Sequence, residues 1–541
     1  MGKKTTTKSQ VEKLIDQYSK DFDALSNIRD TFGEKEEVFL GKTDTSSTKS
    51  QVFDPRISTY IIERAARVMA QNPTGVVRGA GRQDEQVAKL FNLILKNYVF
   101  PNANSQFDFL TKGRLLDIYS NVYGSYGVLV DWVVKDDYIG PDFYLIPIRN
   151  LVFQSSVQTF NDSDYVFVVS YVTEEWLKSR DKSIWRNVDK VLEKKEKEKE
   201  SKSYVEQEYT TGFKGFQIIT KFEKDRWITF SKDAQVILRD IPNPQKNGKL
   251  PVVLKHCFPL IDRIIGLGEI ERTKTLQKAI NSLLNLYLDG VKMSIFPPLM
   301  INPQGAILRT LTYEAGAKWL VRSPGSVAQL PLSPAGANIF QSTYGFLNAA
   351  ILNAFGTTDI ATTPKTTSEL GKTPRALGML QFRESSRDNW DRFMLERAME
   401  EILDRFVDLI SKRQEKPMKF VISKDDYKAI KEFKPDLAET FKVNKYNEII
   451  IKKDDLKNTT CKYFIEAGST LKADEALENE NLTAILGLIL KIPGVVEQIV
   501  GGGQIKFGKT TVDFGELLKR WIATSGVKNY EKIISVSEET K

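Results

Sequence analysis

Cysteine and histidine are scarce in this chain, whose 541 residues include two cysteines and one histidine. Cys257 and Cys461 lie far apart and are too few for a disulfide framework or a cysteine-rich zinc site, so we expect two reduced core thiols. His256 alone cannot build a multi-histidine metal site and leaves few routes to Ser-His or Cys-His catalysis. It precedes Cys257 in "LPVVLKHCFPL", a predicted strand, where adjacent side chains point to opposite faces. We therefore expect a structural histidine, no catalytic residue, no metal site and no cofactor.

Long apolar runs are also missing. No uncharged run reaches the roughly 18 residues that a membrane span needs, and the nearest, Leu482 to Leu490, is followed by Lys491 and Pro493. The N-terminal "MGKKTTTKSQ" lacks the apolar region of a secretory signal. We expect a soluble protein, made in a reducing cytoplasm, without a membrane span.

Neither charge sign dominates. The 78 basic and 70 acidic residues give a net charge of +8, spread over a large and otherwise balanced surface. This small excess allows contact with nucleic acid but does not show the concentrated basic face of a DNA-clamping domain. Hydrophobic residues at 41% and charged residues at 27% are typical of a globular protein.

What the sequence does contain is a mixture of helical and strand periodicities. Residues 1–50 are polar, with one amphipathic stretch from Val11 to Ile28, and are expected to be a flexible segment. Helices are predicted over residues 83–97 and 107–120, and strands in "GVLVDWVV", "FQIITKFEKDRWITFS" and "AQVILRDIP", the last two from a sheet with one face in water. Strands and helices do not alternate regularly, so the fold class is α+β, without the parallel sheet of an α/β protein.

Three long helices are the most informative elements. "GLGEIERTKTLQKAINSLLNLYLDGVKMSI" places apolar residues on one helix face, with Asn281, Asn285 and Asp289 on the opposite face. Ser333 and Pro334 begin a second helix, and Thr373 and Pro374 begin a third that runs to Lys412. The third would be about 58 Å long at 1.5 Å per residue, too long for a compact single-core domain. The chain therefore builds something elongated.

The motif "GGGQIKFGKTT" matches the phosphate-binding pattern G-x-x-x-x-G-K-[ST] from Gly503 to Thr510. A phosphate-binding loop must follow a buried strand, open a helix and be followed by further strands of the sheet. Only 31 residues follow Thr510, and the next predicted helix starts nearer Asp513. We expect a turn followed by a short hairpin or an extended link, which carries a basic loop, Lys506 and Lys509, and we keep a nucleotide hydrolase as an alternative.

The order and spacing of several segments resemble the portal, or head-tail connector, proteins of tailed bacteriophages. The main segment is "GLGEIERTKTLQKAINSLLNLYLDGVKMSIFPPLMINPQG", and weaker similarities are "SNVYGSYGVLVDWVV", "YLIPIRNLVF" and "FIEAGSTLKADEAL". Together they extend from about Phe53 to Leu477. The resemblance implies an elongated α+β portal fold, assembled as a cyclic ring of twelve subunits around a DNA channel. No enzymatic activity is implied.

The resemblance also implies a role for each segment. After the flexible residues 1–50, it implies a wing (51–262 and 375–470), stem helices (263–295 and 333–356), a clip (296–332), a tunnel loop (357–374) and a helical crown without a long barrel (471–541).

Candidate contact residues follow from these roles. The tunnel loop would face DNA through Thr362, Thr363, Lys365 and Lys372, with Asp359 and Glu369 limiting its positive charge. The clip would contact an adaptor through Arg309, Lys318, Trp319 and Arg322, although Trp319 fits packing between subunits equally well.

The implied partners are further copies of the chain, the major capsid protein, the terminase large subunit, head-tail adaptor and tail proteins, and double-stranded DNA bound without sequence specificity. The implied location is the portal vertex of the virion, after synthesis in the host bacterial cytoplasm. A different adaptor or structural protein of the virion remains a further alternative.

Overall fold

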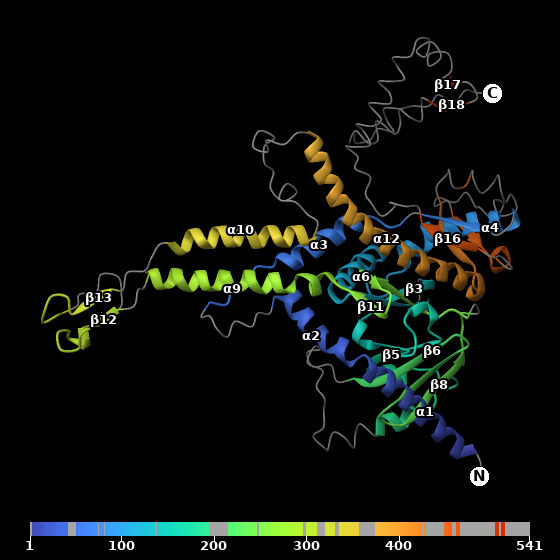
Figure 1. Ribbon diagram of the computed structural model, residues 1–541. Helices are drawn as coiled ribbons and strands as arrows, with labels where there is room; N and C mark the ends of the chain where they lie inside the picture. Colours follow the sequence, from blue (N-terminus) through green and yellow to red (C-terminus); the bar gives the residue numbers. More distant parts are fainter. Residues whose placement is uncertain are drawn as a thin grey trace. The chain divides into compact units, whose positions relative to one another are not determined.

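The computed structural model divides the chain into two compact units, Met1–Ala467 and Gly468–Lys541, which are described separately. The residues described are 3–41, 50–73, 75–79, 82–135, 138–193, 215–245, 248–295, 299–310, 320–329, 335–355, 374–422, 427, 448–456, 461–465, 504–507 and 510–513. Helices and strands are mixed in the first unit, and every strand pair in this described part of the chain is antiparallel (Figure 1). The α+β class predicted from the sequence is confirmed.

A three-stranded sheet forms the centre of the first unit. Its order is β3 (Ile139–Ile146), β2 (Ser125–Val134) and β9 (Val252–His256), and it contacts the helices α6 (Phe109–Tyr123) and α12 (Pro374–Arg413). Aromatic rings join these layers: Phe109 of α6 lies 5.3 Å from Phe143 of β3 and 6.5 Å from Phe406 of α12, between ring centroids. The core therefore joins residues more than 250 positions apart in the sequence.

A second sheet has five strands in sequence order. They are β4 (Leu151–Phe153), β5 (Tyr165–Val172), β6 (Phe216–Glu223), β7 (Arg226–Ser231) and β8 (Val236–Pro242). Strands β6 and β7 are buried almost throughout, which differs from the predicted water-facing side. The reason is α1 (Lys3–Ala24), whose Leu14 and Tyr18 pack on Phe167, Ile219 and Phe230 and cover that face.

Residues 3–40 form two helices in the segment that the sequence predicted to be flexible. After α1, the helix α2 (Ser26–Leu40) packs on α9 (Glu269–Ile295), where Glu34 pairs with Lys274 and Lys278 at 2.6 Å each. Arg29 donates hydrogen bonds to the carbonyl oxygens of Arg149 and Leu151, both at 2.7 Å. The polar composition misled the prediction because these helices bury a narrow apolar stripe and pair their charges with the body.

The remaining elements complete the two units. Residues 83–97 were predicted as one helix and form α4 (Arg82–Ile94) followed by a π-helical turn, Leu95–Val99. The other elements are α3 (Arg56–Val68), β1 (Gly75–Gly79), α5 (Phe100–Asn102), α7 (Glu174–Lys178), β10 (Phe258–Leu260), β11 (Arg263–Leu267), β12 (Leu299–Ile301), β13 (Val327–Gln329), α10 (Ala335–Phe355), β14 (Met418–Val421), β15 (Glu448–Ile451) and β16 (Cys461–Ile465) in the first unit, and β17 (Gln504–Phe507) and β18 (Thr510–Asp513) in the second.

Local chemistry sets the ends of α6. The Asp108 side chain caps its N-terminus by accepting a hydrogen bond from the Thr111 amide at 3.2 Å. Gly124 ends the helix with a φ of 95°, and a Cβ there would lie 2.1 Å from the carbonyl oxygen of Gly266. Glycine is required at this position both for the left-handed backbone and for the close approach of the two chain segments.

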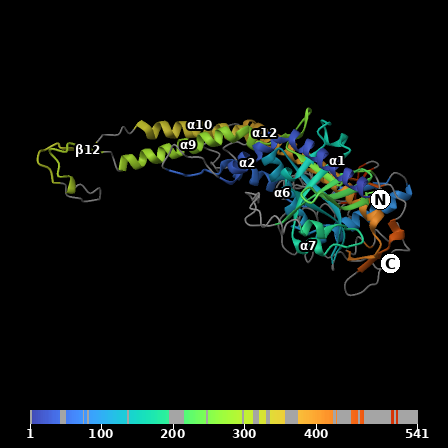
Figure 2. The same cartoon turned by 90° about the horizontal axis from the view of Figure 1, so that it is seen from below.

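The three long helices are present, with one corrected boundary. The first was predicted over residues 263–295, but strand β11 occupies Arg263–Leu267 and the helix α9 begins at Glu269. The helices α10 and α12 match their predicted extents to within two residues. In two views at right angles, α9 and α10 lie side by side (Figures 1 and 2), in agreement with their direct contacts.

Candidate functional site

The pair of helices α9 and α10 is the module from which the candidate site is built. The rings of Tyr287, near the end of α9, and Phe340, near the start of α10, stack with centroids 4.0 Å apart. Ile280 and Ile351 belong to the same buried core cluster, so the two helices run antiparallel. The chain thus leaves the body along α9 and returns along α10.

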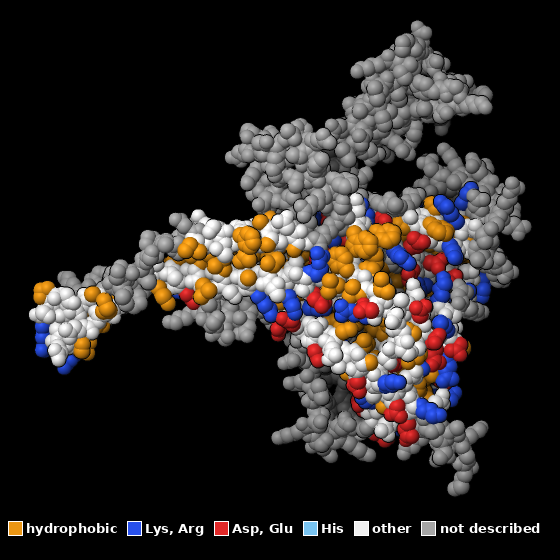
Figure 3. Space-filling view, in the orientation of Figure 1, with side chains coloured by type: hydrophobic (Ala, Val, Ile, Leu, Met, Phe, Trp, Pro, Cys, Tyr) orange, Lys and Arg blue, Asp and Glu red, His pale blue; other side chains and the backbone are white. Residues whose placement is uncertain are grey.

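Hydrophobic side chains remain exposed along this pair. Figure 3 shows them gathered over the two helices, and the exposed ones are Leu286 (59%), Met293 (47%), Ile295 (65%), Ile339 (62%) and Phe346 (72%). An apolar surface of this kind on a polar protein typically marks a contact with another molecule.

A separate, polar face of α9 binds the segment 50–55, which precedes α3. Asn285 accepts a hydrogen bond from the Val52 amide at 2.7 Å and donates one to the Val52 carbonyl at 3.0 Å. Asp289 accepts from the Ser50 amide at 2.9 Å, and Asn281 accepts from the Asp54 amide at 3.1 Å. The side chains of α9 therefore pair with backbone groups as a neighbouring strand would.

The spacing of these residues explains the match. Gln277, Asn281, Asn285 and Asp289 are four apart, so they lie on one face of the helix with a rise of about 6 Å per step. Every second residue of an extended chain advances by a similar distance, about 6.6 Å. The sequence placed Asn281, Asn285 and Asp289 opposite the apolar face but did not reveal their partner. In the structure Gln277, Asn281 and Asn285 are buried.

The same segment also reaches α10. Asp54 accepts a hydrogen bond from the Tyr344 hydroxyl at 2.5 Å, and Arg56 donates to that hydroxyl at 2.8 Å and also to Asn348. Arg56 pairs in turn with Asp54 at 2.9 Å. The segment 50–55 and Arg56 therefore hold the two helices in a fixed relation.

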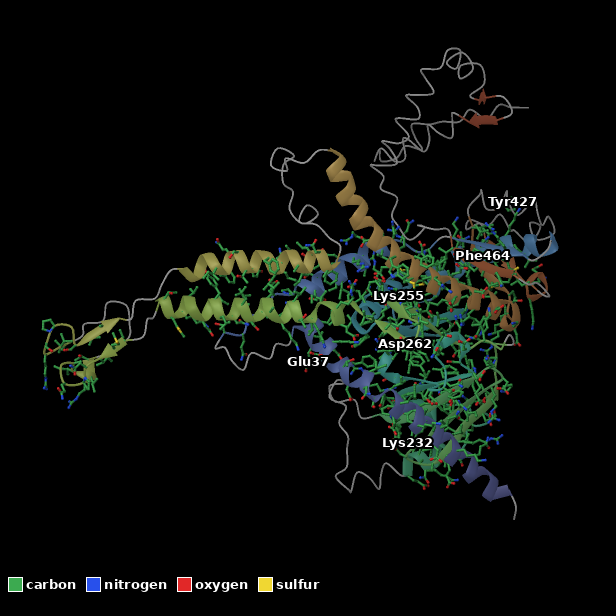
Figure 4. All side chains as sticks on the ribbon, in the orientation of Figure 1. Glu37, Lys232, Lys255, Asp262, Tyr427 and Phe464 are labelled. Atoms are coloured by element: carbon green, nitrogen blue, oxygen red, sulfur yellow. The ribbon has the colours of Figure 1, made fainter. Side chains whose placement is uncertain are left out.

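A buried charged cluster anchors the N-terminal end of α9. It consists of one residue from each of five elements: Arg64 (α3), Asp117 (α6), Lys255 (β9), Glu269 (α9) and Asp391 (α12). Nζ of Lys255, which Figure 4 labels, lies 2.5 Å from Asp117 and 2.6 Å from Asp391. Arg64 lies 2.8 Å from Glu269 and 3.4 Å from Asp391. The cluster therefore connects α9 to the central sheet and to three other helices.

The cluster holds three carboxylates and two buried cations, and the half-buried Arg272 adds a third cation 3.2 Å from Glu269. Burial, and then the neighbouring Asp391 carboxylate, raise the pKa of Asp117 to about 7 against the opposing effect of Lys255. Burial acts in the same direction on Asp391, but Lys255 and Arg64 outweigh it and lower its pKa to about 2. Asp117 is therefore the carboxyl of this pair that takes up a proton first as the pH falls, while Asp391 remains ionised.

His256 and Cys257 do not form a dyad, because each side chain has a different hydrogen-bond partner. His256 Nδ1 lies 2.8 Å from Oγ of Ser125, whereas the Cys257 thiol donates to Oδ1 of Asn121 at 3.0 Å. Burial lowers the pKa of His256 to about 4 and raises that of Cys257. The prediction of two buried free thiols is confirmed, since Cys257 and Cys461 are both buried and neither is in a disulfide.

Between α9 and α10 the chain forms a small β structure, the predicted clip. Strands β12 and β13 pair from Leu299 with Gln329 to Ile301 with Val327, and Ala306 bridges to Val321. Gly305 is required here because a Cβ would lie 2.0 Å from Oγ of Ser326. Several apolar side chains of this structure are exposed: Met300, Ile301, Leu308, Leu320 and Val321.

Two of the four predicted clip contacts can be placed. Arg309 and Arg322 are exposed, and neither forms an ion pair with the described residues. The backbone of Arg322 is fixed by a hydrogen bond from its amide to the Gly305 carbonyl at 2.7 Å. Lys318 and Trp319 lie outside the described residues.

The predicted DNA contacts are less well covered. Thr362, Thr363, Lys365 and Lys372 lie outside the described residues. In the second unit Lys506 belongs to strand β17, whereas Lys509 is again outside the described part. These DNA contacts therefore stay predictions.

The motif that matched a phosphate-binding loop has different neighbours from those such a loop needs. Strands β17 and β18 pair antiparallel, with Phe507 opposite Thr510. Thr510, the position that would hold magnesium, starts a strand, whereas the loop requires it to start a helix. The expected short hairpin is present, and Asp513 lies in its second strand.

Searches of the described residues give two negative findings. No group of three or more His, Cys, Asp or Glu there is arranged to hold a metal ion. None of the helices described is both long and apolar enough to cross a membrane. Comparison with protein-family models and with curated proteins found no match to the sequence.

Sequence reasoning missed the two features that fix α9. The amide face was visible as a four-residue repeat, but nothing in the sequence linked it to residues 50–55. The charged cluster left a weaker signal: Arg64 interrupts the apolar stripe of Ile61, Ala65 and Val68, and Lys255 interrupts the run "VVLKH". A charge inside an apolar run indicates a buried pair, but the partner cannot be identified from the run alone.

Proposed function

We propose that this chain is the portal subunit of a tailed bacteriophage. Twelve copies would form a ring at one capsid vertex, conduct double-stranded DNA, and dock the packaging terminase and then a tail adaptor. In this proposal the protein is structural and catalyses no reaction. The proposal combines the sequence resemblance with the α9, clip and α10 arrangement described above.

The observation that carries the proposal is the exposed apolar surface on the antiparallel helix pair. In a single chain these side chains would face water, at a cost of about 25 cal/mol for each Å² of apolar area. In a ring, the helix pair of one subunit would lie against that of the next, and the apolar side chains would be shared between neighbours. A ring of more than two subunits joins two different faces of each subunit, and the exposed apolar side chains of α9 and of α10 could supply one face each.

Two further features fit a stem whose helices are held in fixed positions. The segment 50–55 fixes α9 to α10 through hydrogen bonds to its backbone, and the Lys255 cluster ties α9 to four other elements. A subunit that surrounds moving DNA needs its helices held at fixed positions. The small net charge of +8 also suits contact with DNA that slides, because each neutralised phosphate adds affinity.

The clip fits a docking role. Exposed Arg309 and Arg322 stand beside exposed apolar side chains in the short β structure between the helices. Arginine together with apolar residues is typical of protein interfaces. We assign the terminase and adaptor contacts to this structure.

Symmetry-resolved electron microscopy and native mass spectrometry of the purified full-length protein test the proposal. We expect a cyclic particle of about 740 kDa, twelve copies of 61.5 kDa, with a central channel. Monomers at every salt and protein concentration would contradict it. A closed ring without a channel wide enough for duplex DNA would instead favour another structural protein of the virion.

A further inference from the structure

A pocket of about 280 Å³ is lined by residues 158–161, by residues of β9, β10 and β11 between Leu254 and Ile264, and by one face of α12. Its lining includes three aromatic residues, two arginines and the only histidine: Phe160, Trp390, Phe393, Arg263, Arg397 and His256. None of the features assigned above uses this pocket.

The aromatic wall of the pocket is held in place yet open to solvent. Trp390 and Phe393, both on α12, are 42% and 53% exposed. Their ring centroids are 6.2 Å apart. The indole nitrogen of Trp390 donates to the Cys257 carbonyl at 3.1 Å, which fixes the ring against β9. A rigid, exposed aromatic pair of this kind is suited to receive an apolar group.

The hydrogen bonds of His256 direct one donor to the pocket. The Gly266 amide donates to Oγ of Ser125 at 2.8 Å, so the Ser125 hydroxyl has its own proton free to donate to Nδ1 of His256. In the tautomer in which Ser125 donates to Nδ1, the imidazole proton lies on Nε2, and no described residue accepts a hydrogen bond from Nε2. Because burial keeps the ring neutral near pH 7, this N–H is a fixed, uncharged donor.

The rim of the pocket is positively charged. Arg263 and Arg397 are exposed and form no ion pair with the described residues. The one acidic residue of the lining, Glu401, lies 3.6 Å from Arg405, whose charge offsets its own. Two unpaired guanidinium groups beside an N–H donor are complementary to a carboxylate.

We propose that this pocket is a binding site for a small aromatic acid, that is, an aromatic ring joined to a carboxylate. The ring would lie against Trp390 and Phe393, and the carboxylate would accept hydrogen bonds from Arg397 and His256 Nε2. The volume is just below the range of ordinary ligand pockets and holds one such group. The acid could be free in solution or be the C-terminal residue of a peptide, since both present the same chemistry.

Having a single histidine makes the test direct. Labelling the full-length protein with ¹⁵N-histidine gives one pair of imidazole nitrogen signals, which can be followed by NMR during titration with phenylacetate. We expect the Nε2 signal to shift and saturate at about millimolar concentration, the range for a ligand of this size. Phenylacetamide, which lacks the charge, should bind at least about fivefold more weakly.

Two variants on the same helix complete the test. Arg397→Gln should weaken phenylacetate binding by about tenfold. Arg392→Gln is the matched control, because Arg392 bonds within its own helix to Asn389 and does not line the pocket, and it should leave binding unchanged. N-acetyl-phenylalanine distinguishes the sources: tighter binding than phenylacetate indicates a peptide end, and weaker binding indicates a free acid. An unshifted Nε2 signal, or equal binding by Arg397→Gln and wild type, would overturn the proposal.

Discussion

Asn285 pairs with both backbone groups of Val52, accepting from its amide at 2.7 Å and donating to its carbonyl at 3.0 Å. The two residues are 233 positions apart. A side-chain amide is the one neutral group that can satisfy a peptide unit in this way, because it carries a carbonyl and an N–H donor side by side. The pairing makes residues 50–55 part of the helix pair.

Replacing Asn285 by alanine should therefore release this segment. Both backbone groups of Val52 would lose their partner, at a cost of about 1–3 kcal/mol for each group left unsatisfied. We expect the Val52 amide to exchange with deuterium much faster, as measured by hydrogen exchange and mass spectrometry. Asn353→Ala, at an exposed position on α10, is the control and should leave exchange at Val52 unchanged. Equal protection in both variants would show that Asn285 does not hold the segment.

Lys255→Met should be among the most destabilising single substitutions in the chain. It leaves Asp117 and Asp391 buried without their shared cation, and breaking a buried pair in this way costs about 3–5 kcal/mol. Denaturant unfolding measures the loss. The control is Lys224→Met, because Lys224 and Asp164 form an exposed pair that contributes about 1 kcal/mol or less. A similar, small loss in both variants would contradict the role assigned to the cluster.

The stability contributed by Asp117 should depend on pH. Its folded pKa, about 7, lies above its ordinary value of 3.8, so its contribution is complete below the ordinary value and is lost as the pH rises through about 7. His256 acts in the opposite sense, since its folded pKa of about 4 lies below 6.5 and its contribution is lost as the pH falls. Absolute stability therefore mixes the two effects.

A variant separates them. Asp117→Asn keeps an oxygen for Lys255 but does not titrate, whereas His256 titrates in both proteins. We expect the difference in unfolding free energy, wild type minus Asp117→Asn, to fall between about pH 4 and pH 8. Urea unfolding at several pH values measures it. A constant difference would mean that Asp117 is ionised throughout this range.

The sequence predicted a helix or strand correctly where the periodicity of its own residues indicates it. It predicted less where the structure of one segment depends on contacts with another segment far away in the sequence. Gly266 to Ile295 has helical periodicity, and only its start was wrong, because β11 occupies Arg263–Leu267. The hairpin of residues 504–513 was predictable because a phosphate-binding loop lacked its required neighbours. Residues 50–55 have no periodicity of their own, since their structure comes from the amides of α9.

The N-terminal helices show the same limit from another side. A polar sequence with a short amphipathic stretch is typical of a linker, and its partner surface on the five-stranded sheet is composed of residues beyond position 150. The sequence periodicity indicates that α1 has an apolar stripe, but it does not indicate that this stripe packs on a sheet. Similarly, Trp390 and Phe393 are exposed because they line a pocket, and the other residues of that pocket lie far from them in the sequence.

Tyr18→Ala tests whether α1 is part of the folded body. Tyr18 is 4% exposed, and its ring meets that of Phe167 edge to face at a centroid distance of 5.5 Å. Removing a buried aromatic side chain costs about 3–5 kcal/mol, so we expect a clear loss in denaturant unfolding. Asp16→Ala, at an exposed position two residues earlier in α1, is the control and should change stability little. A flexible N-terminal segment would make the two variants alike.

Phe346→Asp tests the surface on which the proposed ring depends. Phe346 is 72% exposed in the single chain, so a charge at this position should leave the folded subunit intact. If neighbouring subunits cover it, the substitution places a carboxylate in each apolar contact and removes a burial worth about 1.5–3 kcal/mol per subunit. We expect native mass spectrometry to show a shift from the ring to smaller species, with an unchanged circular dichroism spectrum. Gln341→Asp introduces the same charge at an exposed position on another side of α10, five residues from Phe346, and should still assemble. A complete ring from Phe346→Asp would show that this face of α10 lies outside the subunit contact.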